Sequence, residues 1–275
     1  GTLSGSPNLT ATTSSGIATF SGLKFVGLPG QNYVLHFAVA NNGLTATDSN
    51  NFTVTYAAAS KLVITQQPVG GNATRSALTL QPIVEIRDAY DNLITGGADS
   101  TRTVTINIHS DNNAGRGDLS MGTLSVAAVG GVATFSGVIL SDAKINNNYT
   151  FDFSATLNGA SVTSSASNAI QVVHAAADHI TLSTAVAGAK AGLAFTTQPV
   201  VQVRDIEENV VTDGAYSNAL IEVATSNGST LSGTTSMHAV AGQAAFTGLS
   251  LAGSMANYTL SFSSNTLNTV TQQVS

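Results

Sequence analysis

The feature that most constrains this chain is an eight-residue word that occurs three times at nearly even distances. The word reads GGVATFSG around Phe135, and close copies read SGIATFSG around Phe20 and AGQAAFTG around Phe246. The spacings between these phenylalanines are 115 and 111 residues. Solenoid repeats have periods of about 20 to 50 residues, so the longer period predicts autonomous domains arranged in series.

Two further words recur in the same order as the first. QPIVEIRD at residues 81–88 returns as QPVVQVRD at residues 198–205, and words beginning with Asn-Tyr start at Asn32, Asn148 and Asn257. Three words in a constant order indicate tandem copies of one unit.

The joints between the copies also align, because FTVTYAAASKLVI in the first joint matches IQVVHAAADHITL in the second. We therefore place the boundaries after Ala59 and Ala177. This division predicts that residues 1–59 are the C-terminal half of a domain, and that residues 60–177 and 178–275 are complete domains. The alanine-rich linkers between them are only a few residues long.

Within each unit the apolar residues alternate with a period of two, which is typical of strands with one buried face. Tyr149, Phe151 and Phe153 alternate with Thr150 and Asp152, so the aromatic positions are expected to face the core. The same alternation occurs at residues 33–37, 52–56, 104–108 and 258–262.

Turn signals such as DAYDN at residues 88–92 separate these runs, and sustained helical periodicity is missing from the sequence. Residues 183–195 are rich in alanine, but Gly188 and Gly192 would weaken a helix there. Each unit is therefore expected to contain about seven short strands. The predicted fold class is all-β, with tandem immunoglobulin-like antiparallel β-sandwich domains of roughly 100 residues each.

The order of these words resembles the bacterial immunoglobulin-like (Big, invasin-like) tandem repeats of large prokaryotic surface proteins. KLVITQQP, LQPIVEIRDAYDNLIT, GGVATFSGVIL and NYTFDFSA carry the resemblance, which extends over the whole chain. Its members include adhesins, surface-layer proteins and stalk or filament proteins. The resemblance implies a location outside the cell or on its surface and a spacer or adhesive role.

The composition excludes several classes of protein. Only 9% of the residues are charged, the formal net charge is −6, and the nine Lys and Arg residues are scattered, so the basic surface needed for nucleic-acid binding is missing. The sequence has no cysteine, which excludes disulfides, thiolate metal sites and a cysteine nucleophile. We expect no membrane insertion in this segment, because no apolar run reaches about 18 residues.

Acidic turns are the main candidates for chemistry. Dense oxygen ligands at two matching turns could hold calcium and stiffen the array, although Asp and Asn also favour turns for local reasons. We favour the turn interpretation and keep calcium as the alternative, with no other cofactor expected. The candidate residues are Asp88, Asp91 and Asn92 in the first turn, and Asp205, Glu207, Glu208 and Asn209 in the second.

Two other motifs have simple structural explanations. RGD at residues 116–118 could be an integrin-recognition sequence, but it occupies the place of GTLSG at the start of the chain, so a strand beginning explains it. His174, Asp178 and His179 cluster at the second joint and could bind a metal or act as a protonation switch. Packing at a strand end is the interpretation that we favour.

We expect a non-enzymatic protein, because the sequence shows no catalytic motif and its carboxylates repeat with the units. The leading hypothesis is a structural repeat segment that spaces, stiffens or assembles a prokaryotic extracellular or cell-surface protein. Its expected partners are neighbouring copies of the same protein or other cell-surface components. The alternative is an adhesive module that binds a glycan or a host protein through loops at the sandwich ends.

The first unit matches only the second half of the repeat, from the GTLSG word onward. A half sandwich leaves apolar faces and strand edges uncovered. Either residues 1–59 belong to a longer array, which we favour, or strands from another segment or chain complete this unit by strand addition.

Overall fold

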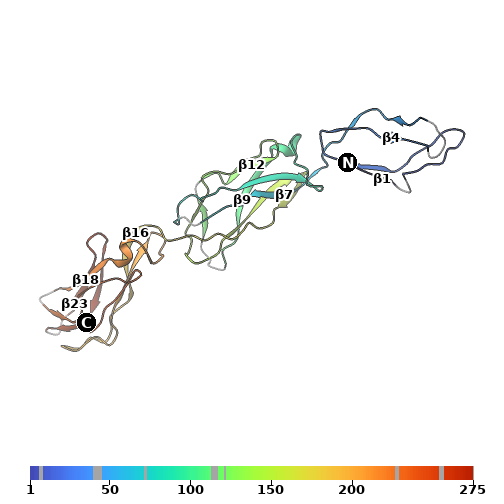
Figure 1. Cartoon of the computed structure of the whole chain (residues 1–275). Helices are drawn as coiled ribbons and strands as arrows, with labels where there is room; N and C mark the ends of the chain where they lie inside the picture. Colours follow the sequence, from blue (N-terminus) through green and yellow to red (C-terminus); the bar gives the residue numbers. More distant parts are fainter. Residues whose placement is uncertain are drawn as a thin grey trace.

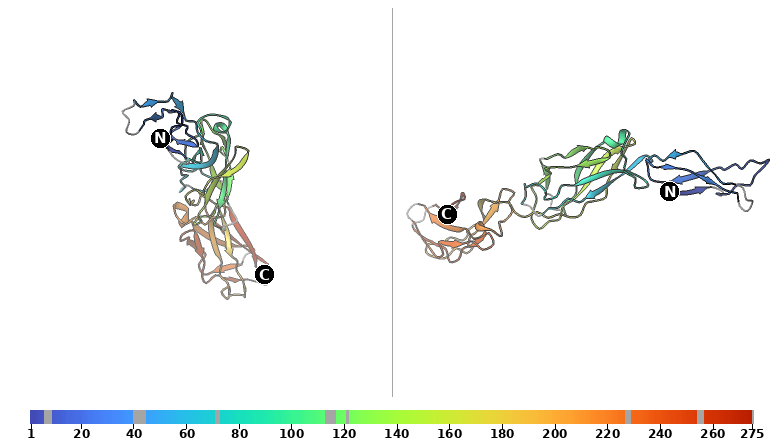
Figure 2. Two further views of the ribbon diagram at one scale, coloured as in Figure 1. Left: turned by 90° about the vertical axis from the view of Figure 1, so that its right-hand side faces the viewer. Right: turned by 45° about the horizontal axis from the view of Figure 1, so that its top comes forward.

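The computed structural model describes residues 1–5, 9–39, 45–70, 73–112, 117–120, 122–226, 229–253 and 257–274. Three lobes follow one another along an elongated molecule, with the N-terminal lobe in blue and the C-terminal lobe in orange and red (Figures 1 and 2). Each sheet takes all its strands from one lobe, so the lobes are described in turn as the first, middle and third units.

The middle unit is an antiparallel sandwich. One sheet has the order β12-β8-β7, the other has the order β11-β9-β14-β15, and β10 pairs with β13. The strands are β7 (Ala59–Gln66), β8 (Ile83–Asp88), β9 (Thr103–Ser110), β10 (Asp118–Ser120), β11 (Ser125–Ala127), β12 (Val132–Thr134), β13 (Ile139–Ser141), β14 (Thr150–Leu157) and β15 (Ala160–Thr163).

The third unit repeats this arrangement. Its sheets have the orders β16-β17-β21 and β20-β18-β23-β24, and β19 pairs with β22. The strands are β16 (Ala177–Thr184), β17 (Val200–Asp205), β18 (Leu220–Thr225), β19 (Thr230–Ser232), β20 (Ser236–His238), β21 (Gln243–Ala245), β22 (Ser250–Ala252), β23 (Tyr258–Ser263) and β24 (Thr269–Val274).

The first unit contains three antiparallel strand pairs, β1-β2, β3-β6 and β4-β5. These strands are short, and the β1-β2 pair resembles the β10-β13 pair of the middle unit. They are β1 (Thr2–Gly5), β2 (Leu23–Val26), β3 (Asn32–Tyr33), β4 (His36–Phe37), β5 (Thr47–Asp48) and β6 (Phe52–Thr53).

The cores lie between the facing sheets, on the faces that the alternation predicted. Tyr149, Phe151 and Phe153 are each 0% exposed, and the ring of Phe153 lies 5.2 Å from that of Phe135 in the opposite layer. The corresponding rings of the third unit, Phe246 and Phe262, are 5.8 Å apart. Aromatic pairs at such separations stabilise a core beyond the area that they bury. The prediction of the core-facing parity is confirmed.

The local structure explains why the eight-residue word recurs. Its first two residues have positive φ angles, 56° and 81° at Gly130 and Gly131, and 47° and 73° at Ala241 and Gly242. Two consecutive residues of this kind form the tight turn whose twist matches a β-hairpin. The flanking residues pair across it, as Val129 does with Val132. In the middle and third units the word is therefore a hairpin turn followed by a short strand, β12 or β21, and the core phenylalanine comes directly after that strand.

Helical structure in the described residues is limited to two single turns of 3-10 helix, η1 (Ala98–Thr101) and η2 (Ala215–Asn218). Residues 185–195 contain turns and isolated bridges in place of a helix, as expected from their glycines. Several strands have three residues or fewer, so the described part of a complete unit has nine strands where about seven were expected. In the described residues we find no helix that is long and apolar enough to cross a membrane. The chain is all-β and is built from immunoglobulin-like antiparallel sandwiches, as predicted.

Candidate functional site: the joints between the units

At both joints, a buried aspartate of the unit that follows the linker accepts a hydrogen bond from the linker backbone. Asp88 is the last residue of β8 and is 0% exposed, and its Oδ2 accepts a hydrogen bond from the backbone N–H of Ala57 at 2.9 Å. Asp205 ends β17, is also 0% exposed, and accepts one from Ala175 at 2.9 Å. We call these two contacts, Ala57–Asp88 and Ala175–Asp205, the linker latches.

The same aspartates also close the turns that follow their strands. Oδ1 of Asp88 accepts the backbone N–H groups of Tyr90 and Asn92, both at 2.9 Å, and the side-chain amide of Asn92 donates to Oδ2 at 3.0 Å. Asp91 has a φ of 68°, a conformation that aspartate and asparagine adopt more readily than most residues. The carboxylate therefore accepts four hydrogen bonds, three from its own turn and one from the linker.

This environment sets the ionisation of Asp88. Burial by itself would raise the pKa of the carboxyl group, but the hydrogen bonds from Asn92, Ala57 and Tyr90 outweigh burial. The pKa of Asp88 consequently lies below its ordinary value. The first linker latch therefore uses the charged form of the side chain, which makes stronger hydrogen bonds than a neutral acceptor.

A ring from each linker lies against the loop before the 3-10 helix of the next unit. Tyr56 packs against the middle core, and its hydroxyl is so close to Gly96 that a Cβ atom there would lie 2.7 Å away. At the second joint the two positions are His174 and Asp213, and His174 Nε2 lies 3.1 Å from Asp213 Oδ1. The first joint therefore places a tyrosine ring against a glycine, and the second places a smaller histidine ring against an aspartate carboxylate. Both joints thus have a contact between the linker ring and this loop.

The second joint has additional contacts between the loop at residues 143–145 and the turn of the third unit. The side-chain amide of Asn209 donates to the carbonyl of Ala143 at 3.0 Å, and its Oδ1 accepts the N–H of Ile145 at 3.3 Å. Lys144 Nζ donates to the carbonyl of Glu207 at 2.9 Å. Asn209 is 3% exposed, so these contacts are shielded from water.

The remaining candidate calcium ligands have protein partners. Asp91 Oδ1 lies 2.7 Å from Lys61 Nζ, and Glu208 Oε1 lies 3.1 Å from His179 Nε2. Glu207 is mostly buried, and its carboxylate lies 3.5 Å from the guanidinium of Arg75 in the middle unit.

The carboxylates of Asp88 and Asp205 accept hydrogen bonds from N–H groups of their own turns and of the linkers. In the described part of the chain, His, Asp and Glu side chains form no group of three that could hold a metal ion. Asp88 and Asp205 present their oxygens to N–H groups, which a cation would have to displace. The turn interpretation stays a prediction, with calcium as its alternative.

The histidines at the second joint have separate partners. His174 contacts Asp213, whereas His179 contacts Asp178 at 3.0 Å and Glu208. The RGD motif is only partly visible, because residue 116 lies outside the described residues. Asp118 begins β10 and pairs with Ser141, so this end of the motif belongs to a sheet ladder.

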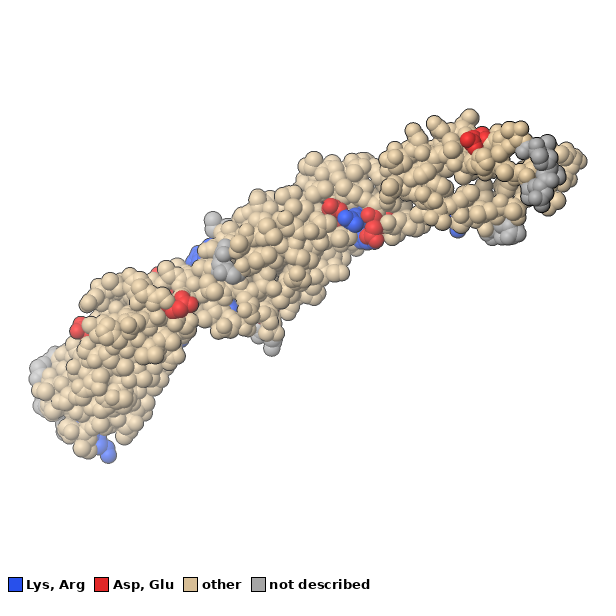
Figure 3. Space-filling model, viewed as in Figure 1, with Lys and Arg blue, Asp and Glu red and all other residues tan. Residues whose placement is uncertain are grey.

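Charge is sparse on the surface. In the space-filling view most of the visible face is uncharged, and a small group of acidic and basic atoms lies near the junction of the first and middle units (Figure 3). Ion pairs in this part of the middle unit link Lys61 to Asp91 and Arg87 to Glu85. Both pairs join residues of the middle unit and do not link it to the first unit.

Sequence reasoning assigned the aspartates to turns but missed the inter-unit contacts of Asn209, Lys144 and Asp213. The alignment of the two joints held a signal for the latches, because Ala57 and Asp88 are 31 residues apart and Ala175 and Asp205 are 30 apart. At the first joint Asn92 stands in the place of Asn209 and donates to Asp88 of its own turn, so the alignment carried no signal for the contact across the second joint.

No protein-family model matches the sequence, and a search of curated proteins finds no match. Solved structures overlap with it loosely. A β-glycosidase from Bacteroides vulgatus is 12% identical with a TM-score of 0.33, and the match covers 78% of this chain and 24% of that one. The chain thus spans about a quarter of the length of that enzyme.

Two further structures give similar values. Fibronectin(III)-like modules of Clostridium thermocellum CbhA are 10% identical with a TM-score of 0.22, covering 77% of this chain and 90% of that one. Domains 4–9 of the surface layer protein SbsC are 13% identical with a TM-score of 0.26, covering 84% and 33%. Overlaps this loose say nothing about activity.

Proposed function

We propose that this chain is a non-enzymatic structural segment of a prokaryotic extracellular or cell-surface protein, in which immunoglobulin-like units in series act as a stiff spacer. The observation that carries the proposal is the linker latch, which occurs at both joints with the same geometry. A flexible tether between independent domains would have no need of a buried acceptor for its backbone.

The latch limits bending for a simple physical reason. Residues 56–59 and 174–177 connect the units, and the N–H of the second residue in each linker points at a carboxylate of the following unit. Rotation about the linker breaks this hydrogen bond and leaves a buried carboxylate with one donor fewer. A hydrogen bond to a charged group contributes about 1.5–3 kcal/mol, so the straight arrangement is favoured over bent ones.

The surface fits a spacer that remains soluble without carrying much charge. Only 9% of residues are charged, so Ser, Thr and Asn side chains supply most of the polar surface. The net charge of −6 disfavours nucleic acid as a partner. The partners that we propose are neighbouring copies of the protein or other cell-surface components, which the polar sheet faces would contact laterally.

Small-angle X-ray scattering tests the spacer function. The wild-type chain is expected to have the pair-distance distribution of a single extended rod at 25 °C. A variant with Asp88→Asn and Asp205→Asn is expected to keep its β-sheet circular dichroism but to show the broader distribution of a flexible array. A wild-type chain as flexible as this variant would refute the proposal.

Two exposed tyrosines favour a second function, an adhesive module that binds a glycan. Tyr90 is 64% exposed and Tyr216 is 40% exposed, and tyrosine rings are suitable stacking surfaces for sugars. Binding to immobilised glycans, followed by its loss in Tyr90→Ser and Tyr216→Ser variants, would support this alternative. Retention of binding in both variants would exclude these rings as the site.

A further inference from the structure

The first unit has a core face without a cover. In the middle unit the residues of this face are buried, whereas no side chain is buried among the described residues 1–5, 9–39 and 45–58. Leu23 and Phe25 are only partly buried, but their counterparts Val138 and Leu140 are 0% and 1% exposed. The side chains are apolar in both units, so the difference comes from what lies on top of them.

One identical segment shows this difference directly. Residues 18–22 and 133–137 both read ATFSG. Ala133 is 0% exposed and Phe135 is 1% exposed, whereas Ala18 is exposed and Phe20 is partly buried. The ring of Phe20 nevertheless keeps its partner Phe37 at 5.5 Å, as Phe135 keeps Phe153 at 5.2 Å. The segment is therefore already in its core-forming arrangement.

The backbone of this segment is a strand edge. In the middle unit Ala133 pairs with Val84 of β8, and the N–H of Phe135 donates to the carbonyl of Pro82 at 3.1 Å. Within the described part of the chain, no hydrogen bond reaches the backbone of residues 18–20. Exposed edges with this pattern of donors and acceptors are templates for an added strand.

The turn before the segment also lacks a neighbour that the complete units supply from the backbone beyond β8 and β17. A Cβ atom on Gly131 would lie 2.4 Å from the carbonyl oxygen of Ile94, and one on Gly242 would lie 2.4 Å from that of Val211. Around Gly16, the counterpart in the first unit, no atom of the described residues lies within 4 Å of such a Cβ position. All three glycines have φ between 73° and 81°, so the turn is the same and only the neighbouring backbone differs.

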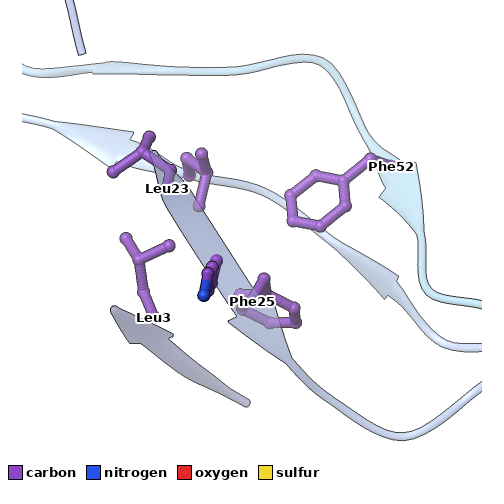
Figure 4. A pocket seen from close by; sticks show the side chains of 6 residues that line it. Leu3, Leu23, Phe25 and Phe52 are labelled. Carbon is purple, nitrogen blue, oxygen red and sulfur yellow. The ribbon is translucent and has the colours of Figure 1, made fainter. Parts of the chain in front are cut away.

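The uncovered face is hollow. A pocket of about 230 Å³ is lined by Leu3, Leu23, Lys24, Phe25, Leu35 and Phe52, which come from β1, β2, β6 and the residues before β4. Figure 4 shows Leu3, Leu23, Phe25 and Phe52 around this hollow. An apolar pocket of this kind accepts aliphatic side chains from an incoming strand.

The complete units show which strand fills this space, because both use the same Gln-Pro word. Gln81 Oε1 accepts the N–H of Val138 at 2.9 Å, and Gln198 Oε1 accepts that of Leu249 at 2.9 Å. Pro199 accepts the N–H of Phe246 at 3.0 Å, as Pro82 does that of Phe135. The apolar residues that follow the word then enter the core, and they are Val84, Ile86, Val201 and Val203.

We propose that the first unit is an acceptor site for a β-strand of this repeat's own type, with a Gln-Pro word followed by alternating aliphatic residues. The strand pairs antiparallel with residues 17–19 and places its aliphatic side chains over the pocket. Both strands of this type within residues 60–275 are buried in their own units, so the occupant is an additional strand supplied from outside the described fold.

A fluorescent peptide with the sequence of residues 78–88, LTLQPIVEIRD, tests this proposal by anisotropy with the full chain. We expect saturable binding to the wild-type chain. Ala18→Arg places a large side chain on the covered face and is expected to weaken binding at least tenfold. Thr19→Arg is the matched control because its counterpart Thr134 points outward, so binding is expected to stay within twofold.

A fused chain keeps the test decisive if the free peptide binds weakly. Adding a second copy of residues 60–116 directly before Gly1 raises the effective concentration of the strand. Hydrogen exchange at the amides of Ala18 and Phe20 is expected to slow at least tenfold relative to the wild-type chain. Ala18→Pro removes the N–H at position 18 and is expected to abolish the slowing at Phe20.

Three results would overturn the proposal. These are equal peptide binding by the wild-type chain and Ala18→Arg, unchanged exchange in the fused chain, or a concentration-dependent dimer in sedimentation that protects the Phe20 amide. The last result would identify a second copy of this chain as the occupant.

Discussion

Replacing Asp205 with asparagine is expected to remove the hydrogen bond to the linker at the second joint while keeping the hydrogen bonds that close the turn after β17. The substitution preserves size and leaves one carbonyl oxygen, which can still accept the N–H groups of Glu207 and Asn209 now bound at 2.9 and 2.8 Å. In that orientation the new amide nitrogen faces the N–H of Ala175, where a carboxylate oxygen now accepts at 2.9 Å. Two donors then face each other, and the linker latch is lost.

The expected magnitude follows from the burial of this contact. Asp205 is 0% exposed, so water does not replace the lost acceptor while the joint stays closed. A hydrogen bond to a charged group contributes about 1.5–3 kcal/mol, and a factor of ten in an equilibrium constant corresponds to about 1.4 kcal/mol. The equilibrium between the closed and open joint is therefore expected to shift by roughly 10- to 150-fold toward the open form.

Pulsed electron–electron double resonance measures this shift as a change in the distribution of distances between two spin labels. The chain contains no cysteine, so spin labels at Thr103→Cys in β9 and Thr271→Cys in β24 report on the middle and third units alone. Both positions are exposed. A single narrow distribution is expected for the wild-type chain, and a broad one for Asp205→Asn.

Glu208→Gln is the matched control, because it removes a charge from the same turn without removing an inter-unit contact. Glu208 pairs with His179 and Arg204 of its own unit. Its distance distribution is expected to match that of the wild-type chain. If Asp205→Asn also gives the wild-type distribution while its circular dichroism is unchanged, the latch does not hold the joint and the reasoning is wrong.

Three further predictions follow from the same structure. In chemical denaturation, Phe135→Ala is expected to lower the free energy of unfolding of the middle unit by about 3–5 kcal/mol. Phe20→Ala, in the identical ATFSG word, is expected to lower that of the first unit much less, because the ring of Phe20 is only partly buried. Equal losses would contradict the inference that the first unit is uncovered. Because the pKa of Asp88 is lowered in the folded state, its contribution to folding stability is complete above the ordinary pKa of 3.8 and is lost as the pH falls through the folded-state pKa. In an acid titration followed by circular dichroism, Asp88→Asn is expected to lose less folding stability between pH 4 and pH 2 than the wild-type chain. An unchanged acid response would exclude this role. Chelation with EDTA is expected to leave the melting temperature unchanged, because N–H groups satisfy Asp88 and Asp205; a drop of several degrees would establish calcium at the turns.

The sequence determined the repeat, the fold class and the buried parity of the strands. These are local or periodic properties, since successive side chains of a strand point to opposite faces and a repeated word folds into a repeated structure. The core positions of Phe151 and Phe153 therefore follow from residue order alone.

Only the tertiary structure decided which distant groups meet. The amide of Ala57 reaches Asp88 across 31 residues, and Asn209 reaches Ala143 across 66, because chain folding brings strand ends together at the joints. The ATFSG word makes the same point, since its alanine and phenylalanine are buried in the middle unit, whereas in the first unit Ala18 is exposed and Phe20 is only partly buried. Burial depends on the partner strand as well as on the segment itself, and residue order within the segment carries no information about whether that partner is in place.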